Sequence, residues 1–159
     1  GSLERDPVTN LSLFTASRHE TWFREALPVL NRGGVVLSAR NYFSSKIYQG
    51  IAEGMGAEYV HNVTAQFMDE RYMTPDLTVI FTLAKAVRKR RIEIRGLPEN
   101  PDTFESRGDH FQAKLDMGYQ QMATEYGYPT IDAEGKEAVV QERFRTIALQ
   151  AMRATSFIE

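Results

Sequence analysis

The hydrophobic positions along this chain predict helices that alternate with short apolar strands. Between Leu11 and Leu30 the apolar residues recur mostly at three- and four-residue intervals, which predicts an amphipathic helix ending at Gly33-Gly34. Similar patterns predict helices over residues 44–51, 60–72, 84–95, about 104 or 108 to 126, and 136–152. The inward stripes expected for the last two helices are Phe111, Leu115, Tyr119 and Met122, and Val139, Val140, Phe144, Ile147, Ala148 and Ala151.

Three short apolar runs, at residues 34–38, 76–83 and 130–133, are predicted to be strands. In the first two runs the apolar residues are nearly continuous, as expected of strands that are covered by helices on both faces. The order helix, strand, helix, strand, helix, strand is typical of an α/β fold with a parallel sheet.

Composition narrows the class of protein. The 159 residues are the size of a single domain, and the absence of cysteine excludes disulfides, thiolate metal sites and a cysteine nucleophile. His19, His61 and His110 have no ligand-like spacing, so we predict no metal site built from the protein's own histidines. The net charge of −2 does not support nucleic-acid binding, and no apolar run is long enough to cross a membrane. We therefore expect one soluble domain over residues 1–159, and the absence of cysteine fits a reducing compartment.

The first predicted strand runs into a polar segment that contains Arg40. Ligands of open parallel sheets bind beyond the carboxyl ends of the strands, and a guanidinium group offers a planar set of donors that suits phosphate. Spacing alone, however, favours an ordinary exposed loop arginine. The hydroxyl and amide side chains that could complete an anion site are Ser38, Asn41, Ser44, Ser45, Tyr48 and Gln49.

Two further groups of residues have a functional and a structural interpretation. Phe14 and Arg18 share one helix face, although the pair taken alone favours core packing for Phe14 and a solvated cation for Arg18. Arg88, Arg91 and Arg95 lie along one face of a basic helix, which is most often simply solvated. The functional alternative is that these cations close over a polyphosphate. In that case residues 84–107 form a lid-like segment, with an exposed, mobile loop at 96–101.

Three blocks, taken in order, resemble the thymidylate kinase family of nucleoside monophosphate kinases. They are LSLFTASRHE at 11–20, the segment 35–50 and PDLTV at 75–79, and Ile131-Asp132-Ala133 also fits the family. The resemblance implies a P-loop-kinase-like, three-layer α/β/α fold with a parallel sheet. It also implies ATP-dependent phosphorylation of dTMP to dTDP, with Mg²⁺, in a cytoplasmic homodimer whose interface is formed by helices 17–30 and 60–72.

The same resemblance implies roles for individual residues. Phe14 would stack on the thymine ring, Arg18 would bind the exocyclic oxygen of the ring, and Arg40 would hold the monophosphate. Arg40 and Arg91 are the expected catalytic cations. The remaining implied residues are Ser44, Ser45, Tyr48 and Gln49 in the nucleoside pocket, Arg88, Arg91 and Arg95 on the lid side of the ATP site, and Ala133 near adenine.

Two departures from the family pattern affect what we expect of this chain. Ala39 stands where the family has an aspartate, and no G-x-x-x-x-G-K-[ST] phosphate loop occurs in the 159 residues. In the family, the strand before that loop lies between the strands expected here at 34–38 and 76–83. We therefore expect the C-terminal part of a longer kinase, lacking its first strands and nearly inactive alone. The alternative is a degenerate, non-catalytic nucleotide-binding relative.

Overall fold

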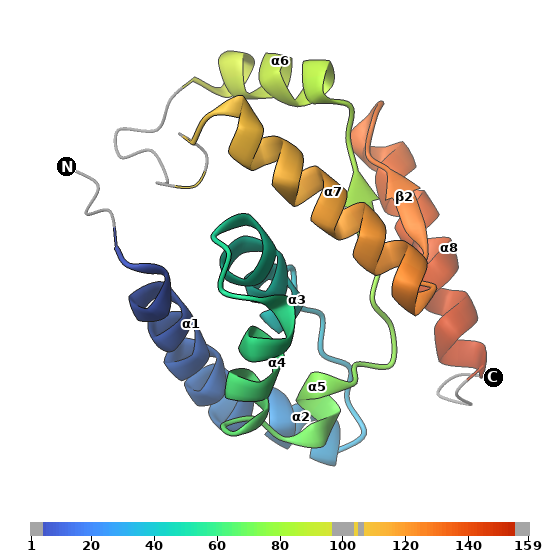
Figure 1. Ribbon diagram of the computed structural model, residues 1–159. Helices are drawn as coiled ribbons and strands as arrows, with labels where there is room; N and C mark the ends of the chain where they lie inside the picture. Colours follow the sequence, from blue (N-terminus) through green and yellow to red (C-terminus); the bar gives the residue numbers. More distant parts are fainter. Residues whose placement is uncertain (1–4, 97–103, 105–106, 155–159) are drawn as a thin grey trace. The chain divides into compact units, whose positions relative to one another are not determined.

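The computed structural model describes residues 5–96, 104 and 107–154 (Figure 1). The chain divides into two compact units, which we describe separately. The sheet unit comprises the described parts of Asp76–Arg107 and Tyr119–Glu159, and the helical unit comprises those of Leu3–Pro75 and Gly108–Gly118. The expectation of a single domain over residues 1–159 stays a prediction. Most of the expected mobile loop at 96–101, with the rest of residues 97–103 and 105–106, lies outside the described residues.

The sheet unit is built on two parallel strands, β1 (Ile80–Thr82) and β2 (Thr130–Asp132). Their register pairs Ile80 with Thr130, Phe81 with Ile131 and Thr82 with Asp132. Ile80 and Ile131 are buried, and β1 and β2 confirm strands in the runs predicted at 76–83 and 130–133. The predicted extent of the first run is wrong, because residues 76–79 are not strand, and Phe81 is 50% exposed rather than covered. The helices of this unit are α6 (Lys85–Arg95), the C-terminal part of α7 (Asp109–Tyr126) and α8 (Glu137–Ala154).

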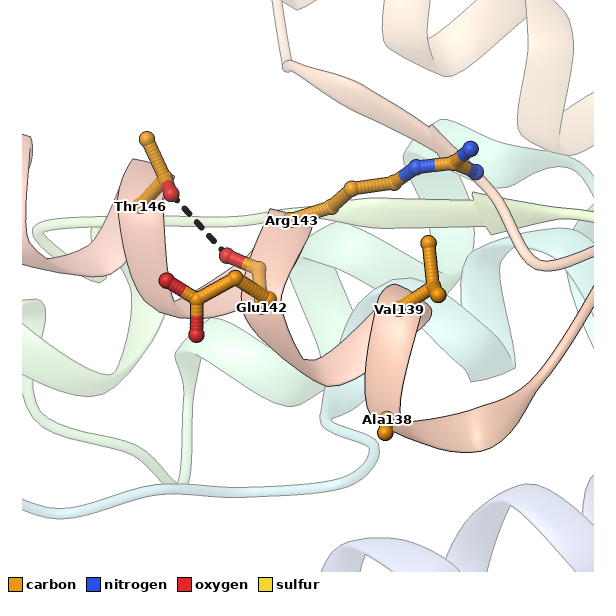
Figure 2. A pocket seen from close by; sticks show the side chains of 5 residues that line it. All are labelled: Ala138, Val139, Glu142, Arg143 and Thr146. Atoms are coloured by element: carbon orange, nitrogen blue, oxygen red, sulfur yellow. Dashed lines mark hydrogen bonds between the residues drawn. The ribbon is translucent and has the colours of Figure 1, made fainter.

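The helix α8 contacts β2, and the ring of its Phe144 lies 6.0 Å from the ring of Phe81 on β1. The apolar side chains predicted to face inward on α8 are nevertheless less buried than expected. No residue of this helix is fully buried, and Val139 is exposed. In α7 the prediction holds better, since Leu115 and Met122 are both buried. A shallow hollow of about 400 Å³ lies along α8. Figure 2 shows the residues that line it, Ala138, Val139, Glu142, Arg143 and Thr146.

The helical unit begins with a helical run made of α1 (Pro7–Thr21), the π-helical segment η1 (Trp22–Ala26) and α2 (Leu27–Asn31). Asp6 caps its start by accepting the Val8 N–H at 2.7 Å, and Pro7 occupies the first turn, where its missing N–H costs nothing. Gly33 follows the run with a φ of +75°, which confirms the predicted glycine ending. Leu11 and Trp22 are buried, whereas Leu13, Phe14 and Phe23 remain exposed.

The segment that follows is not the predicted strand. Residues 34–38 are irregular, and the side chains of Val35 and Leu37 are 49% and 77% exposed, so the expectation of a buried strand at 34–38 is wrong. Backbone N–H and C=O groups form a strand only when a neighbouring strand pairs with them. Among the described residues β1 and β2 pair with each other, and no strand pairs with 34–38.

A turn and a π-helical segment follow the irregular stretch. α3 (Tyr42–Ser45) continues into η2 (Lys46–Ala52), and α1 contacts both of them. The predicted start at Ser44 is wrong by two residues, because the amide oxygen of Asn41 caps the helix by accepting the Phe43 N–H at 3.0 Å. Asparagine is among the preferred residues at this capping position.

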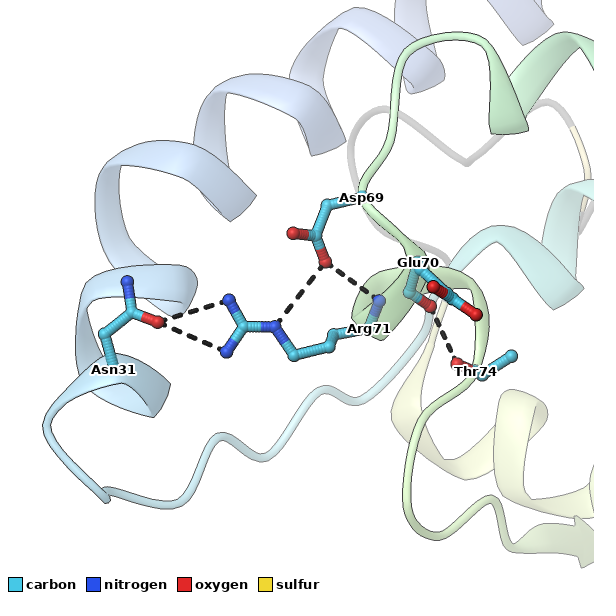
Figure 3. Close-up of polar contacts among 5 residues, drawn as sticks. All are labelled: Asn31, Asp69, Glu70, Arg71 and Thr74. Atoms are coloured by element: carbon cyan, nitrogen blue, oxygen red, sulfur yellow. Dashed lines mark hydrogen bonds and ion pairs between the residues drawn. The ribbon is translucent and has the colours of Figure 1, made fainter.

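The helix predicted over 60–72 is split into α4 (Ala57–Ala65) and α5 (Glu70–Met73). Arg71 ties α5 to the end of α2, since both of its terminal nitrogens donate to Asn31 Oδ1 at 3.2 Å (Figure 3). Asp69 supports this geometry by capping α5 and by lying 3.8 Å from Arg71 Nε. η2 packs against α4, and the buried side chains at their contact include Ile47 and Val60.

None of the described helices is both long enough and apolar enough to span a lipid bilayer.

Candidate functional site

Two arginine–serine pairs meet at the turn α3 in the helical unit. Arg18, on α1, donates from Nη2 to Ser45 Oγ at 3.0 Å, and Arg40, just before α3, donates from Nε to Ser44 Oγ at 3.1 Å. Both serines are buried. Ser45 follows Arg18 by 27 positions, and Ser44 follows Arg40 by 4 positions. The fold brings these four residues together, and all four belong to the nucleotide site that the sequence analysis predicts.

Aromatic rings hold the two guanidinium groups. Arg18 Cζ lies 5.5 Å from the centre of the Phe14 ring, and Arg40 Cζ lies 4.7 Å from the centre of the Tyr48 ring. Both distances fall within the range of cation–π attraction. Within the described part of the chain, Arg40 donates its hydrogen bond through Nε. The N–H groups of its two terminal nitrogens can therefore donate to another acceptor. An arginine held in this way is oriented before any anion arrives.

Gln49 belongs to the same segment but has a partner of its own. Its side chain is 1% exposed, and its Nε2 donates to Glu53 Oε2 at 3.1 Å. Tyr48 also contacts Phe111 edge-on, with the ring centres 6.3 Å apart. The structure thus groups Phe14, Arg18, Arg40, Ser44, Ser45 and Tyr48 by direct contacts, whereas Gln49 is directed to Glu53. The substrate roles expected for these residues stay predictions.

The sequence analysis missed a cluster of rings formed by Tyr42, His61, Tyr72 and Trp22. Tyr42 lies 6.1 Å from Tyr72 and 5.8 Å from His61 between ring centres, and Tyr72 meets Trp22 edge-on at 5.3 Å. A usable signal was present, because Tyr42 comes two residues after Arg40 and three before Ser45, on the same helical turn as Ser45. The pattern alone did not show that Tyr72 and His61 would join it.

The pKa of Tyr72 is shifted from its ordinary value. Burial raises the pKa of its hydroxyl above the ordinary value of 10.0, and the nearby Arg18 charge and the backbone N–H of Tyr42 offset part of that increase. The neutral tyrosine is therefore the favoured form beside Arg18 over the whole physiological range.

We expect this shift to appear as a loss of stability at alkaline pH. The pKa of Tyr72 is higher in the folded state than in the unfolded state. The contribution of Tyr72 to the free energy of unfolding is therefore complete below pH 10.0 and is lost as the pH rises above 10.0. In Tyr72→Phe, the free energy of unfolding in urea should fall less between pH 8 and pH 11 than in the wild type. Tyr59→Phe, which changes an exposed tyrosine, should retain the wild-type slope; an unchanged slope in Tyr72→Phe would contradict the assignment.

In the sheet unit, arginines bind the loop that follows β2. Arg91 Nη2 donates to the carbonyl oxygens of Ala133 at 2.9 Å and Gly135 at 3.2 Å, and Arg143 Nη1 donates to that of Asp132 at 2.7 Å. Two residues predicted for the ATP side, Arg91 and Ala133, are therefore in contact. Arg88 and Arg95 lie on the same helix, α6. The roles of these four residues in binding ATP stay predictions.

The hollow along α8 is a poor candidate for the site. All five of its lining residues come from one helix, and none of the predicted site residues is among them (Figure 2). The arginine–serine pairs are the better candidate, because all four of their residues belong to the predicted site.

The described residues contain no group of three His, Asp or Glu side chains that could hold a metal ion. Ala39, at the position of the family's aspartate, offers no oxygen ligand from its side chain. The first finding concerns a site built from three or more His, Asp or Glu side chains, whereas Mg²⁺ is usually held by one or two carboxylates together with substrate phosphates.

Comparison with known proteins identifies the family. The family model of thymidylate kinase matches residues 2–144. The thymidylate kinase of Chlamydia caviae is 30% identical over 131 residues, which are 82% of this chain and 62% of that protein. The probable thymidylate kinase of Pyrobaculum aerophilum is 34% identical over 128 residues, which are 80% of this chain and 61% of that protein. The chain thus spans about three fifths of the length of these relatives.

A solved structure supports the same conclusion at the level of the fold. The crystal structure of thymidylate kinase from Ehrlichia chaffeensis superposes with a TM-score of 0.65 at 17% identity, over 92% of this chain and 69% of that one. This likeness confirms the P-loop-kinase-like α/β fold expected from the sequence. With the match to the family model over most of its length, the chain belongs to the thymidylate kinase family.

Proposed function

We propose that the protein to which this chain belongs transfers the γ-phosphoryl group of ATP to dTMP and so forms dTDP. The proposal is that the helical unit binds dTMP and that the sheet unit contributes to the ATP site. We also propose that the protein is cytoplasmic and works as a homodimer, as expected from the family resemblance. The name shared by the relatives supports the reaction, since each is described as a thymidylate kinase or probable thymidylate kinase.

The observation that carries the proposal is the pair of oriented arginines at α3. Arg18 is held by Phe14 and Ser45, and Arg40 by Tyr48 and Ser44. A flat base with an exocyclic oxygen suits an aromatic ring beside a guanidinium group, and a monophosphate suits a second guanidinium group with unused donors. One nucleotide can contact both arginines only if the two side chains lie close together. Their hydrogen-bond partners, Ser45 and Ser44, are consecutive residues, which supports this condition.

Within this proposal each residue has a limited task. Phe14 stacks on thymine, Arg18 donates to the exocyclic oxygen, and Arg40 holds the phosphate that accepts the transferred group. Tyr48 packs near the deoxyribose, where it disfavours a 2′-hydroxyl, and the buried Gln49 completes the wall of the pocket. Phosphoryl transfer requires mainly positioning and the stabilisation of developing negative charge, which these groups are suited to provide.

The proposed ATP side consists of Arg88, Arg91 and Arg95 on α6, together with the loop at Ala133. Bound ATP supplies the phosphoryl group, and the arginines of α6 counter its negative charge. Arg91 is already hydrogen-bonded to two carbonyl oxygens of that loop, which supports a joint role for the helix and the loop. We assign no step to Mg²⁺, because we identify no protein ligand for it among the described residues.

Titration calorimetry of the 159-residue chain with dTMP, dCMP and dGMP tests the proposal directly. We expect binding of dTMP and at least tenfold weaker binding of the other two nucleotides, since Arg18 meets a base oxygen in thymine but an amino group at the matching position of cytosine. Equal affinities for all three, or no binding, would contradict it.

The presence of Ala39 favours a second candidate, a nucleotide-binding relative without catalytic activity. This candidate predicts that the 159-residue chain binds dTMP without turnover when ATP is supplied. Measurable formation of dTDP by the pure chain would exclude it.

A further inference from the structure

We propose that Tyr42 is a positioning residue for the dTMP site. Its hydroxyl anchors the turn α3 so that the hydroxyls of Ser44 and Ser45 meet Arg40 and Arg18. The inference rests on the proposed function, because its consequence is a change in the affinity for dTMP.

Tyr42 is the first residue of α3 and is 3% exposed. Its hydroxyl lies 3.3 Å from the carbonyl oxygen of Met73, in α5, and 3.4 Å from His61 Nδ1, in α4. Its ring packs against Phe43 with the ring centres 4.5 Å apart. A single side chain therefore connects α3 with α4 and α5 in the helical unit.

The turn α3 is the N-terminal turn of a helical run that continues without a break into the π-helical segment η2. The first backbone N–H groups of a helix have no partners inside it, so side chains contribute to holding this turn. The cap at Asn41 holds the Phe43 N–H, and the Tyr42 hydroxyl adds contacts with α4 and α5. Ser45 lies three residues after Tyr42, on the same face of the turn, so rotating the turn would move both serine hydroxyls away from the arginines.

The two contacts of the Tyr42 hydroxyl require a particular form of His61. The hydroxyl has one proton, and the Met73 carbonyl is only an acceptor, so Tyr42 donates to Met73. His61 Nδ1 must then donate to the tyrosine oxygen, which requires a proton on Nδ1. A proton on Nδ1 of His61 is therefore a spectroscopic signature of the anchor.

Tyr42→Phe removes the hydroxyl and leaves the ring, and Tyr59→Phe is the matched control on a tyrosine that is 51% exposed. By calorimetry we expect Tyr42→Phe to weaken dTMP binding roughly fivefold, the size of effect that one lost hydrogen bond produces, and Tyr59→Phe to change it less than about twofold. In a Ser44→Ala/Ser45→Ala background the effect of Tyr42→Phe should fall below about twofold, because the hydroxyls that Tyr42 positions are gone. Nitrogen-15 spectra should show Nδ1–H on His61 in the wild type and its loss in Tyr42→Phe.

The His61 side provides an independent test should Tyr42→Phe fail to fold. His61→Leu removes the donor and should weaken dTMP binding, whereas His61→Asn places an N–H near the position of Nδ1 and should restore it. Lower thermal stability of Tyr42→Phe with unchanged dTMP affinity, equal effects in both serine backgrounds, or a proton on Nε2 of neutral His61 would each overturn the inference. If the wild-type chain binds no dTMP, the proposed function of this site fails, and the inference fails with it.

Discussion

Replacing Arg40 with alanine is expected to weaken dTMP binding about 50-fold and to change thymidine binding less than about twofold. Hydrogen bonds to a charged group contribute about 1.5–3 kcal/mol, and 1.4 kcal/mol corresponds to a tenfold change in affinity. Thymidine lacks the phosphate, so a loss confined to dTMP would identify Arg40 as the phosphate ligand.

The size of the expected effect follows from how Arg40 is held. Ser44 Oγ accepts from Nε at 3.1 Å, and the Tyr48 ring lies 4.7 Å from Cζ, so the guanidinium group loses little freedom when the phosphate binds. Arg40→Lys keeps the charge but not the planar arrangement of donors, and we expect it to recover only part of the affinity.

Calorimetric titrations of Arg40→Ala, Arg40→Lys and the control Arg32→Ala with dTMP and thymidine would measure this effect. Arg32 is an exposed arginine at the end of α2, so its replacement changes the net charge by the same amount away from the serines. A similar loss of dTMP affinity in Arg32→Ala would indicate a general electrostatic effect. A parallel loss of thymidine binding in Arg40→Ala would place the arginine at the nucleoside instead.

Gly50→Ala is expected to lower the free energy of unfolding by about 2–3 kcal/mol. A Cβ at this position would lie 2.8 Å from the Cα and 3.1 Å from the N of Ala57. These are backbone atoms at the start of α4, so no side chain can rotate out of the way. The added methyl group would have to separate η2 from α4, whose contact contains the buried Ile47 and Val60.

Gly108→Ala is the matched control, because a Cβ there meets no atom within 4 Å. We expect it to be neutral or slightly stabilising, since alanine restricts the unfolded chain more than glycine does. Urea denaturation of both variants would provide the comparison. A cost below about 0.5 kcal/mol for Gly50→Ala would show that η2 and α4 do not pack this closely in solution.

The local pattern of the sequence located most of the helices and two of the strands. Periodic apolar residues predicted the helical run that begins at α1, and the basic helix α6 and the strands β1 and β2 also appeared where the pattern indicated. These features depend on neighbours a few residues apart. Glycine at the end of the first run is a local signal too, since its φ of +75° is one that other residues rarely adopt.

The same local pattern failed where pairing with a distant segment decides the structure. Val35, Val36 and Leu37 have the composition of a buried strand, yet residues 34–38 have no strand partner among the described residues, and the apolar side chains stay exposed. The split between α4 and α5 is a similar case, since the Arg71–Asn31 contact joins residues 40 positions apart. Burial along α8 was also overestimated, because periodicity shows which face is apolar and not what covers it.

For the candidate site, the sequence by itself determined the residue types and their grouping, from Phe14 and Arg18 to the segment that begins at Arg40. Only the tertiary structure decided which partners meet. It joined Arg18 to Ser45 across 27 residues, directed Gln49 to Glu53, and brought Tyr42 between Met73 and His61. The physical reason is that a hydrogen bond or a ring contact depends on positions within a few ångströms, and for residues far apart in the chain those positions are fixed by the packing of α1, α3, α4 and α5.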